Sequence, residues 1–414
     1  MNPLKRRSTL RFAAVAAPVL ALALAGCSSS AGADDESGPA ASDDHSTATE
    51  VSAPRVVVSY DGGLLLLEGD SLEQVDDVPL GGFLRLNPAG DARHVVVSTD
   101  DAFRVLDTGV TIERHGDHAH YYAEVPELTD IEFAAEHPGH VTTHAGTTAL
   151  FADGTGRVEL FDPAALVGGE PEATTYESPD AHHGVAVALE GGGLLTTIGT
   201  SDVRTGAVAF DSSGAEIART EECPGVHGET VAADEVVVIG CENGAVLYRD
   251  GVFTKVASPD IYGRIGNQAG SPESTIVLGD YKVDAEAELE RPQRVSLIDT
   301  DAATLRLVDL GTSYTFRSLA RGPHGEALVL GTDGAIHVID PATGTVTKRI
   351  EVIAAWTEPI DWQQARPSLE THGHRAYVTD PATSTVHVVD LESGEITAST
   401  ELPHVPNELS TVGE

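Results

Sequence analysis

Short apolar runs fill the chain after residue 55, and turn residues separate them. Many of these runs consist of Val, Ile and Leu, and Gly, Asp, Pro or Asn follows them. The spacing that would give a helix one apolar face is nearly absent, whereas short β-branched runs between turn residues are typical of strands. The pattern therefore predicts an all-β protein.

One element recurs through this region: an apolar run, then Asp, then a turn. It ends at Asp70, Asp107, Asp162, Asp211, Asp250, Asp299, Asp340 and Asp390, with weaker copies at the first and fifth of these positions. Their mean spacing of about 46 residues is typical of the blades of a β-propeller, each of which contains several strands. The repeat predicts a single β-propeller of eight blades, with seven blades as the alternative.

The two ends of the repeat region complement each other. Residues 55–78 contain three predicted strands and lack an innermost one, whereas HVPNELSTVG near the C-terminus resembles an innermost strand without a blade. Pairing the C-terminal strand with the first blade would complete that blade and leave no open sheet edge. We expect the ring to close in this way.

The innermost strands of a propeller line its channel, so residues near their starts can form a site from several blades. The segments expected to enter them are DVPLGGFLRL, ELTDIEFAA, PDAHHGVAVA, CPGVHGETVA, IYGRIGNQAG, SYTFRSLARG, QQARPSLETH and LPHVPNELST. His183 and His227 each precede Gly at the same place in two adjacent segments. We expect both at one channel mouth.

A second group of candidate metal ligands lies in RHGDHAHYY, which contains His115, Asp117, His118 and His120. Imidazole nitrogens in a tetrahedral set favour zinc or another late transition metal over calcium or magnesium. His118 and His120 could therefore complete a four-nitrogen site with the two His-Gly pairs, or a three-nitrogen site with Asp117 or Glu229 as the remaining ligand. His182 is expected to point elsewhere, as a supporting or alternative ligand.

The other histidines are expected to have structural or surface roles. His137, His140 and His144 are interpreted as polar surface residues near a strand turn, and His372 and His374 as residues of a loop between strands. The single histidines within blades are His94, His324, His337 and His387.

The N-terminal residues predict export and lipidation. A basic start and a run of small apolar residues lead to Leu24, Ala25, Gly26 and Cys27, which resemble a lipobox. We expect a lipoprotein signal peptide over residues 1–26, lipidation of Cys27, a disordered acidic and Ser-rich tether over 27–54, and the propeller over 55–414. The protein would be extracytoplasmic and anchored by lipid to the outer face of the cell membrane; a soluble secreted protein is the alternative.

The net charge bears on possible partners, and the cysteines bear on a disulfide. The chain has 65 acidic and 25 basic residues and a formal net charge of −40, so it lacks the basic surface that nucleic acid requires. Beyond Cys27 the cysteines are Cys223 and Cys241. In an oxidising compartment they are predicted to form a disulfide, with two thiolate zinc ligands as the alternative.

The chain has no Gly-x-Ser-x-Gly elbow, His-Glu-x-x-His motif, P-loop or dinucleotide fingerprint. We therefore expect a protein that is not an enzyme. Two other classes stay open: a metal-dependent propeller hydrolase or lactonase, and a metal-free docking propeller.

Several segments together resemble the AztD family of extracytoplasmic zinc metallochaperones: HGDHAHYY, AHHGVAV, CPGVHGE, VVVIGCENG, GRIGNQAGS, LGDYKVD and SYTFRSLARGP. The resemblance implies a monomeric β-propeller that binds Zn²⁺ and delivers it to the solute-binding protein of a zinc ABC importer. It carries ligand roles over to His115, His118, His120, His183 and His227. The lipobox departs from the family's soluble periplasmic members and suggests a Gram-positive envelope.

Overall fold

A computed structural model describes residues 49–51, 54–115 and 118–413. The propeller lies in a compact unit that starts at Thr47. The predicted signal peptide, Cys27 and the tether up to residue 48 lie outside the described residues, as does Asp117. No described helix is long and apolar enough to cross a lipid bilayer.

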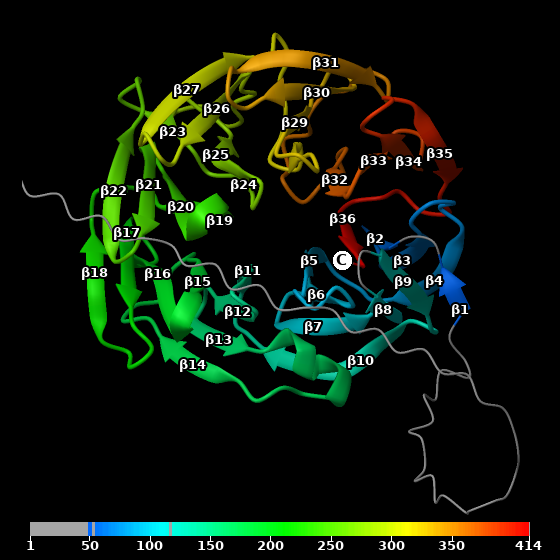
Figure 1. Cartoon of the computed structure of the whole chain (residues 1–414), viewed down its shortest axis with the longest axis horizontal. Helices are drawn as coiled ribbons and strands as arrows, with labels where there is room; N and C mark the ends of the chain where they lie inside the picture. Colours follow the sequence, from blue (N-terminus) through cyan, green and yellow to red (C-terminus); the bar gives the residue numbers. More distant parts are fainter. Residues whose placement is uncertain (1–48, 52–53, 116–117, 414) are drawn as a thin grey trace, which may run out of the picture. The chain divides into compact units, whose positions relative to one another are not determined.

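Eight four-stranded antiparallel units are arranged in a ring about a central axis, which confirms the all-β propeller and its eight blades (Figure 1). From the innermost strand outward, blade 1 contains β36 (Leu409–Val412), β2 (Arg55–Tyr60), β3 (Gly63–Glu68) and β4 (Gln74–Pro79). Blade 2 contains β5 (Arg85–Pro88), β6 (His94–Ser98), β7 (Ala102–Asp107) and β10 (Glu127–Ala134). Blade 3 contains β11 (Pro138–His144), β12 (Thr147–Ala152), β13 (Arg157–Phe161) and β14 (Thr174–Glu177). Blade 4 contains β15 (Ala186–Leu189), β16 (Gly193–Gly199), β17 (Arg204–Phe210) and β18 (Glu216–Thr220).

The second half of the ring repeats this order. Blade 5 contains β19 (His227–Ala232), β20 (Val236–Cys241), β21 (Asn243–Arg249) and β22 (Val252–Ala257), with β23 (Gly263–Arg264) beside β21. Blade 6 contains β24 (Gln268–Ser271), β25 (Ser274–Gly279), β26 (Arg294–Asp299) and β27 (Thr304–Asp309). Blade 7 contains β28 (Leu319–Arg321), β29 (Ala327–Leu330), β30 (Ala335–Asp340) and β31 (Thr345–Glu351). Blade 8 contains β32 (Leu369–His372), β33 (Arg375–Asp380), β34 (Thr385–Asp390) and β35 (Ile396–Glu401). Short 3-10 turns, η1 (Pro163–Gly168), η2 (Glu190–Gly192) and η3 (Ala233–Glu235), interrupt the connections.

The C-terminal strand closes the ring as predicted. β36 pairs antiparallel with β2, and Val412 lies opposite Arg55 while Leu409 lies opposite Val58. Leu409 and Val412 are buried in the contacts between blade 1 and its two neighbours. The last residues of the chain thereby provide the innermost strand that the first blade lacks.

Continuous apolar runs form these strands because the middle of each blade is buried on both faces. In β2, Val56 and Val58 face blade 8, whereas Val57 between them faces blade 2. Side chains alternate between the two faces of a strand, so an uninterrupted apolar run fills two blade contacts at once. An apolar cluster of described residues occupies each of the eight contacts between neighbouring blades.

The recurring aspartates end the third strands and begin the turns to the outer strands. Asp340 Oδ1 accepts from the backbone N–H of Ala342 at 2.9 Å, and Asp299 Oδ1 accepts from that of Ala302 at 2.8 Å. An Asp side chain that binds the backbone two or three residues later stabilises a tight turn. The sequence repeat is thus a repeat of turn chemistry.

The prediction for ELTDIEFAA was wrong. These residues form β10, the outer strand of blade 2, and the innermost strand of blade 3 is β11. An additional hairpin of β8 (Val110–His115) and β9 (His118–Ala123) lies between β7 and β10, and β1 (Thr49–Val51), from the end of the predicted tether, pairs with β9. Because of this insertion, the strand expected to begin blade 3 is in fact the last strand of blade 2.

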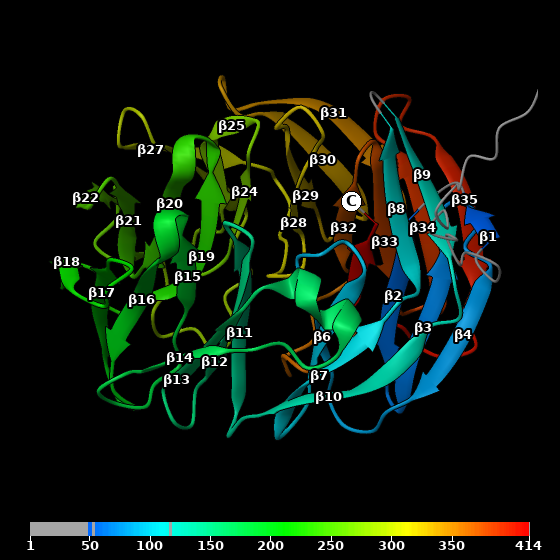
Figure 2. The same cartoon turned by 60° about the horizontal axis from the view of Figure 1, so that its bottom comes forward.

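The ring has two distinct faces. We call the connection face the one where each outer strand leads to the next innermost strand, through residues 80–84, 135–137, 178–185, 221–226, 258–267, 310–318, 352–368 and 402–408. Innermost and third strands both run away from this face because neighbouring strands are antiparallel. The hairpin follows the third strand β7 and therefore extends from the opposite face, which we call the hairpin face (Figure 2).

Candidate metal centre

Three histidines from consecutive blades converge at the connection face. His140 is the third residue of β11, His183 lies in the connection before β15, and His227 begins β19. One ring nitrogen from each lies within 4.8 Å of the other two. The Nε2 atoms of His183 and His227 are 3.1 Å apart. Two nitrogens that bind one zinc ion at about 2.0–2.1 Å in a tetrahedron are separated by about 3.3 Å, so this pair already has the spacing of zinc ligands.

Hydrogen bonds at Nδ1 orient two of the rings. His227 Nδ1 donates to the carbonyl oxygen of Gly266 at 2.7 Å, and His183 Nδ1 contacts Asp153 Oδ2 at 2.5 Å. Because a carbonyl only accepts, the neutral His227 ring holds its proton on Nδ1 and keeps a lone pair on Nε2. The Asp153 carboxylate favours the same tautomer in His183, an arrangement common behind metal-binding imidazoles.

The third ring has a carboxylate partner as well. His140 Nδ1 lies 3.1 Å from Glu229 Oε2, and both side chains are largely buried. The His140 ring centroid lies 5.1 Å from that of His183 and 5.6 Å from that of His227. Two rings are therefore hydrogen-bonded at Nδ1 and the third has a carboxylate oxygen nearby, an arrangement that leaves Nε2 of His183 and His227 open to a shared ion.

Close packing requires the glycine that follows His183 and the glycine that follows His227. A Cβ at Gly228 would lie 2.4 Å from the Gly266 carbonyl oxygen, and φ at Gly228 is +69°. A Cβ at Gly184 would lie 2.4 Å from Cζ of Phe151. The His-Gly pairs thus let His183 and His227 approach neighbouring blades closely.

The site is small and favours neutral imidazole. The space between the rings leaves no room for a water molecule, and it is bordered by Gly184, Val185, Thr197, Val226 and Gly228 besides the histidines. Burial lowers the pKa of His227 well below its usual range, and positive charge on His140, Arg264 and His183 lowers it further. Metal binding requires the neutral ring, so this environment prepares His227 as a ligand.

The other predicted residues around this mouth occupy supporting positions. Glu229 contacts His140 and is not itself a member of the three-histidine cluster. His182 is 2% exposed, and its Nδ1 contacts the Asp180 carbonyl oxygen at 3.0 Å while its Nε2 contacts Thr197 Oγ1 at 3.0 Å. Both ring nitrogens of His182 thus have partners in the protein, and His182 is not a member of the cluster.

The structure separates the hairpin from the cluster. The backbones of His115 and His118 pair beside the hairpin turn, and β8 starts on the hairpin face. His183, His227 and His140 lie at or near the connection face instead. Among the described side chains, which include that of His120, the metal-capable cluster contains no hairpin residue.

His140 is the cluster member that the sequence interpretation missed: it was expected at the surface, whereas its side chain is 21% exposed and lies in the cluster. It was grouped with the surface histidines because β11 was not recognised as an innermost strand. The available signal was spacing: Asp107 and Asp162 are 55 positions apart, the longest interval in the repeat. The long interval indicates an insertion before the innermost strand of blade 3, so that strand should have been sought closer to Asp162 than ELTDIEFAA.

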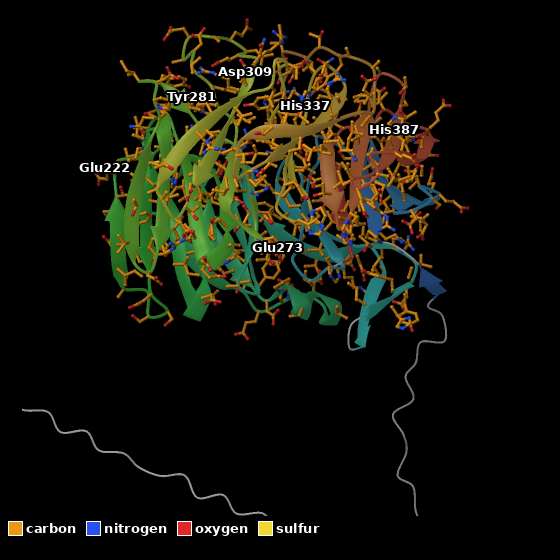
Figure 3. All side chains as sticks on the ribbon, turned by 45° about the horizontal axis from the view of Figure 1, so that its top comes forward. Glu222, Glu273, Tyr281, Asp309, His337 and His387 are labelled. Carbon is orange, nitrogen blue, oxygen red and sulfur yellow. A yellow bond between two sulfur atoms is a disulfide. The ribbon has the colours of Figure 1, made fainter. Side chains whose placement is uncertain are left out.

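Several other histidines have blade partners of their own. His337 and His387 lie in the third strands of blades 7 and 8 (Figure 3). His337 Nε2 lies 3.1 Å from Asp333 Oδ2, and His387 Nδ1 lies 2.8 Å from Ser399 Oγ. Both therefore have the structural contacts expected of them.

Cys223 and Cys241 form the predicted disulfide, which excludes the alternative of two thiolate ligands. Both residues are fully buried in the apolar contact between blades 4 and 5. The bond ties the connection before His227 to β20. It thereby helps to fix the backbone that positions this ligand.

Fold and site together define an eight-bladed β-propeller with a three-histidine cluster of metal-binding geometry where the innermost strands of blades 3 to 5 begin. No family model matches the chain. The chain is 24% identical to the zinc chaperone AztD of Citrobacter koseri over 361 residues, which are 84% of this chain and 82% of that protein.

Solved structures agree on the fold. The crystal structure of Citrobacter koseri AztD superposes with a TM-score of 0.77 at 22% identity, over 88% of this chain and 99% of that one. The apo structure of the same protein gives a TM-score of 0.75 at 22% identity, over 88% of this chain and 98% of that one. The resemblance to the AztD family that the sequence motifs indicated is confirmed.

Proposed function

We propose that this protein is an extracytoplasmic zinc metallochaperone that carries Zn²⁺ on His140, His183 and His227. The observation that carries the proposal is the convergence of three imidazoles, two of them hydrogen-bonded at Nδ1 and the third beside a carboxylate oxygen. The sequence similarity to a zinc chaperone supports zinc as the cargo. The space between the rings leaves no room for an organic substrate, which supports the binding of an ion rather than catalysis.

Three protein nitrogens suit a metal that must be released. A tetrahedral zinc ion bound by three imidazoles takes its fourth ligand from water or from another molecule. An acceptor can therefore add a ligand before any histidine leaves, and the zinc ion passes over through a shared intermediate. We propose that the acceptor is the solute-binding protein of a zinc ABC importer.

Equilibrium zinc titration with a competing fluorescent chelator tests the proposal. His140→Ala, His183→Ala and His227→Ala should each lower zinc affinity by at least about tenfold, because a tetrahedral site with only two protein nitrogens is left. His324→Ala, on the hairpin face in the turn between β28 and β29, is the matched control and should retain wild-type affinity. Wild-type protein that fails to bind zinc would refute the proposal.

Delivery is tested separately by mixing the zinc-loaded protein with the apo solute-binding protein. Transfer should persist when a free chelator that traps released zinc is present, since the ion moves within a complex. Transfer that the chelator abolishes would show release into solution and contradict direct delivery.

We also propose that residues 1–26 are a lipoprotein signal peptide, that Cys27 carries the lipid, and that residues 27–54 link it to the propeller over 55–414. The Leu-Ala-Gly-Cys motif supports this arrangement. Cys27→Ser should move the protein from the membrane fraction to the medium. Mass spectrometry of the wild-type N-terminus should find diacylglycerol on Cys27, and an unmodified Cys27 would contradict lipidation.

A further inference from the structure

Two arginines lie beside the three-histidine cluster on the connection face. Arg204 begins β17 after the turn between the second and third strands of blade 4, and Arg264 lies in β23, in the connection from blade 5 to blade 6. Both side chains are partly exposed. Two neighbouring arginines beside a candidate metal site are unexpected in a chain of net charge −40, because positive side chains repel a bound cation.

Arg264 is tied to the cluster through one glycine. A Cβ at Gly266 would lie 2.4 Å from Arg264 Nη1 and 2.7 Å from its Cζ. The guanidinium thus lies against Gly266, whose carbonyl oxygen accepts from His227 Nδ1. The positive charge of Arg264 also contributes to the lowered pKa of His227, after burial and His140.

Arg204 reaches the cluster from the neighbouring blade. A Cβ at Gly199 would lie 3.0 Å from Arg204 Cγ and 3.1 Å from His182 Cδ2, so the arginine stem and the His182 ring flank the same glycine. His182 directly precedes the ligand His183. Burial lowers the pKa of Arg204 and the charge of Arg264 lowers it further, whereas the negative charges of Glu242 and Asp153 oppose the shift.

Neither arginine has a carboxylate partner at contact distance among the described residues, whereas Arg93, Arg219, Arg349 and Arg366 all have one. The nearby Glu242 side chain is directed at Gly225, where a Cβ would lie 2.4 Å from Glu242 Oε1. Glu242 and Asp153 act on Arg204 only from beyond contact distance, so the two like charges still repel, and a carboxylate from outside would relieve that repulsion.

An exposed apolar side chain lies close to each arginine in the sequence. Val203, next to Arg204, is 59% exposed, and Ile261, in the same connection as Arg264, is 101% exposed. Large apolar groups exposed around a polar centre are typical of protein interaction sites. We call Val203, Arg204, Ile261 and Arg264 the arginine patch.

We propose that the arginine patch docks an acidic side chain of the zinc-accepting protein and guides it to the metal. The inference rests on the proposed zinc-carrier function and adds the chemistry of the acceptor's contact. The guanidinium groups attract and orient a carboxylate at the edge of the cluster. A carboxylate oxygen then displaces the water from the fourth ligand position of zinc before an imidazole nitrogen leaves, with no change in oxidation state. The same cations weaken resting zinc binding, which favours release.

Zinc extraction by chelators of different charge tests the patch without the acceptor. Nitrilotriacetate offers carboxylates, whereas 1,10-phenanthroline is neutral. Arg204→Gln/Arg264→Gln should slow extraction by nitrilotriacetate about tenfold at low ionic strength and leave extraction by phenanthroline nearly unchanged. Arg219→Gln/Arg306→Gln removes the same charge from outer strands and is the matched control.

Equilibrium affinity separates docking from structural support. The patch variant should bind zinc more tightly than wild type, by about twofold to fivefold, because two positive charges leave the neighbourhood of the ion. Weaker zinc binding would assign the arginines a structural role and overturn the inference, as would equal slowing with both chelators. Wild-type protein without zinc affinity would instead refute the proposed function.

An experiment with the zinc-accepting protein distinguishes docking of a protein carboxylate from binding of a small anion. Transfer to the solute-binding protein should slow in the patch variant by about tenfold, through a higher concentration of acceptor at half-maximal rate. Slower extraction by nitrilotriacetate with unchanged transfer to the protein would show that the patch binds small anions only, and would overturn the docking inference.

Discussion

Asp153 should control zinc affinity although it is not placed to bind the ion. Its Oδ2 lies 2.5 Å from His183 Nδ1, and its Oδ1 accepts from the backbone N–H of Gly184 at 3.4 Å. Removing the carboxylate in Asp153→Ala frees the His183 ring to rotate and to place its proton on Nε2, where it would block the metal.

The size of the effect follows from the burial of the pair. Loss of an outer partner of a metal-binding histidine typically costs about 10- to 100-fold in affinity, or about 1.4 to 2.7 kcal/mol. The His183 side chain is 40% exposed and Asp153 is 20% exposed, so solvent can replace part of the interaction. We expect about 10- to 30-fold weaker binding for Asp153→Ala, and about threefold to tenfold for Asp153→Asn, whose amide oxygen still accepts from Nδ1.

Competition titration with a fluorescent zinc chelator at about pH 7.5 measures these affinities. Asp202→Ala changes an exposed aspartate in the corresponding turn of blade 4 and should keep wild-type affinity. Chemical denaturation of each apo variant checks that the ring remains folded. Affinity within twofold of wild type in a folded Asp153→Ala variant would refute the role assigned to this contact.

Three further predictions concern the stability of the ring. Cys223→Ser/Cys241→Ser should lower the free energy of unfolding by about 3 kcal/mol, because the disulfide closes a loop with a sequence separation of 18; a loss below about 1 kcal/mol in urea denaturation would argue against this. Burial lowers the pKa values of His182 and His227, so the unfolded chain binds more protons than the folded protein below about pH 6.5. As pH decreases below that value, the free energy of unfolding of the apo protein should fall by up to about 1.4 kcal/mol per pH unit for each histidine. Denaturation at about pH 7 and pH 5.5 measures this slope, which His182→Asn/His227→Gln should reduce; an equal slope in that variant contradicts the assignment. Leu409→Asp puts a charge into the contact between blades 1 and 8 and should open the ring, which limited proteolysis would detect as faster cleavage of the C-terminus than in wild type; equal cleavage rates would contradict the closure.

The fold could be predicted because its determinants are local and repeated. Each third strand ends in an Asp that binds its own turn, as Asp299 and Asp340 do, and each middle strand is apolar on both faces. These features recur at a spacing that only a few architectures share. Ring closure followed from the missing innermost strand of blade 1 and the surplus strand at the C-terminus.

The site could be predicted only in part, because its ligands depend on which strand occupies which place in a blade. His183 and His227 share a His-Gly signature that close packing against Phe151 and Gly266 imposes. His140 is followed by Val, so it lacks that signature, and the hairpin inserted before β10 concealed its strand. The hairpin histidines looked like partners in sequence, but the direction of β7 places their hairpin on the other face.

The most direct test of the site is a zinc titration that compares His140→Ala with His118→Ala/His120→Ala. The account predicts that loss of His140 weakens zinc binding by at least about tenfold, whereas the hairpin variant keeps wild-type affinity. A hairpin variant that loses tight binding while His140→Ala retains it would contradict the assignment of the metal centre to the connection face.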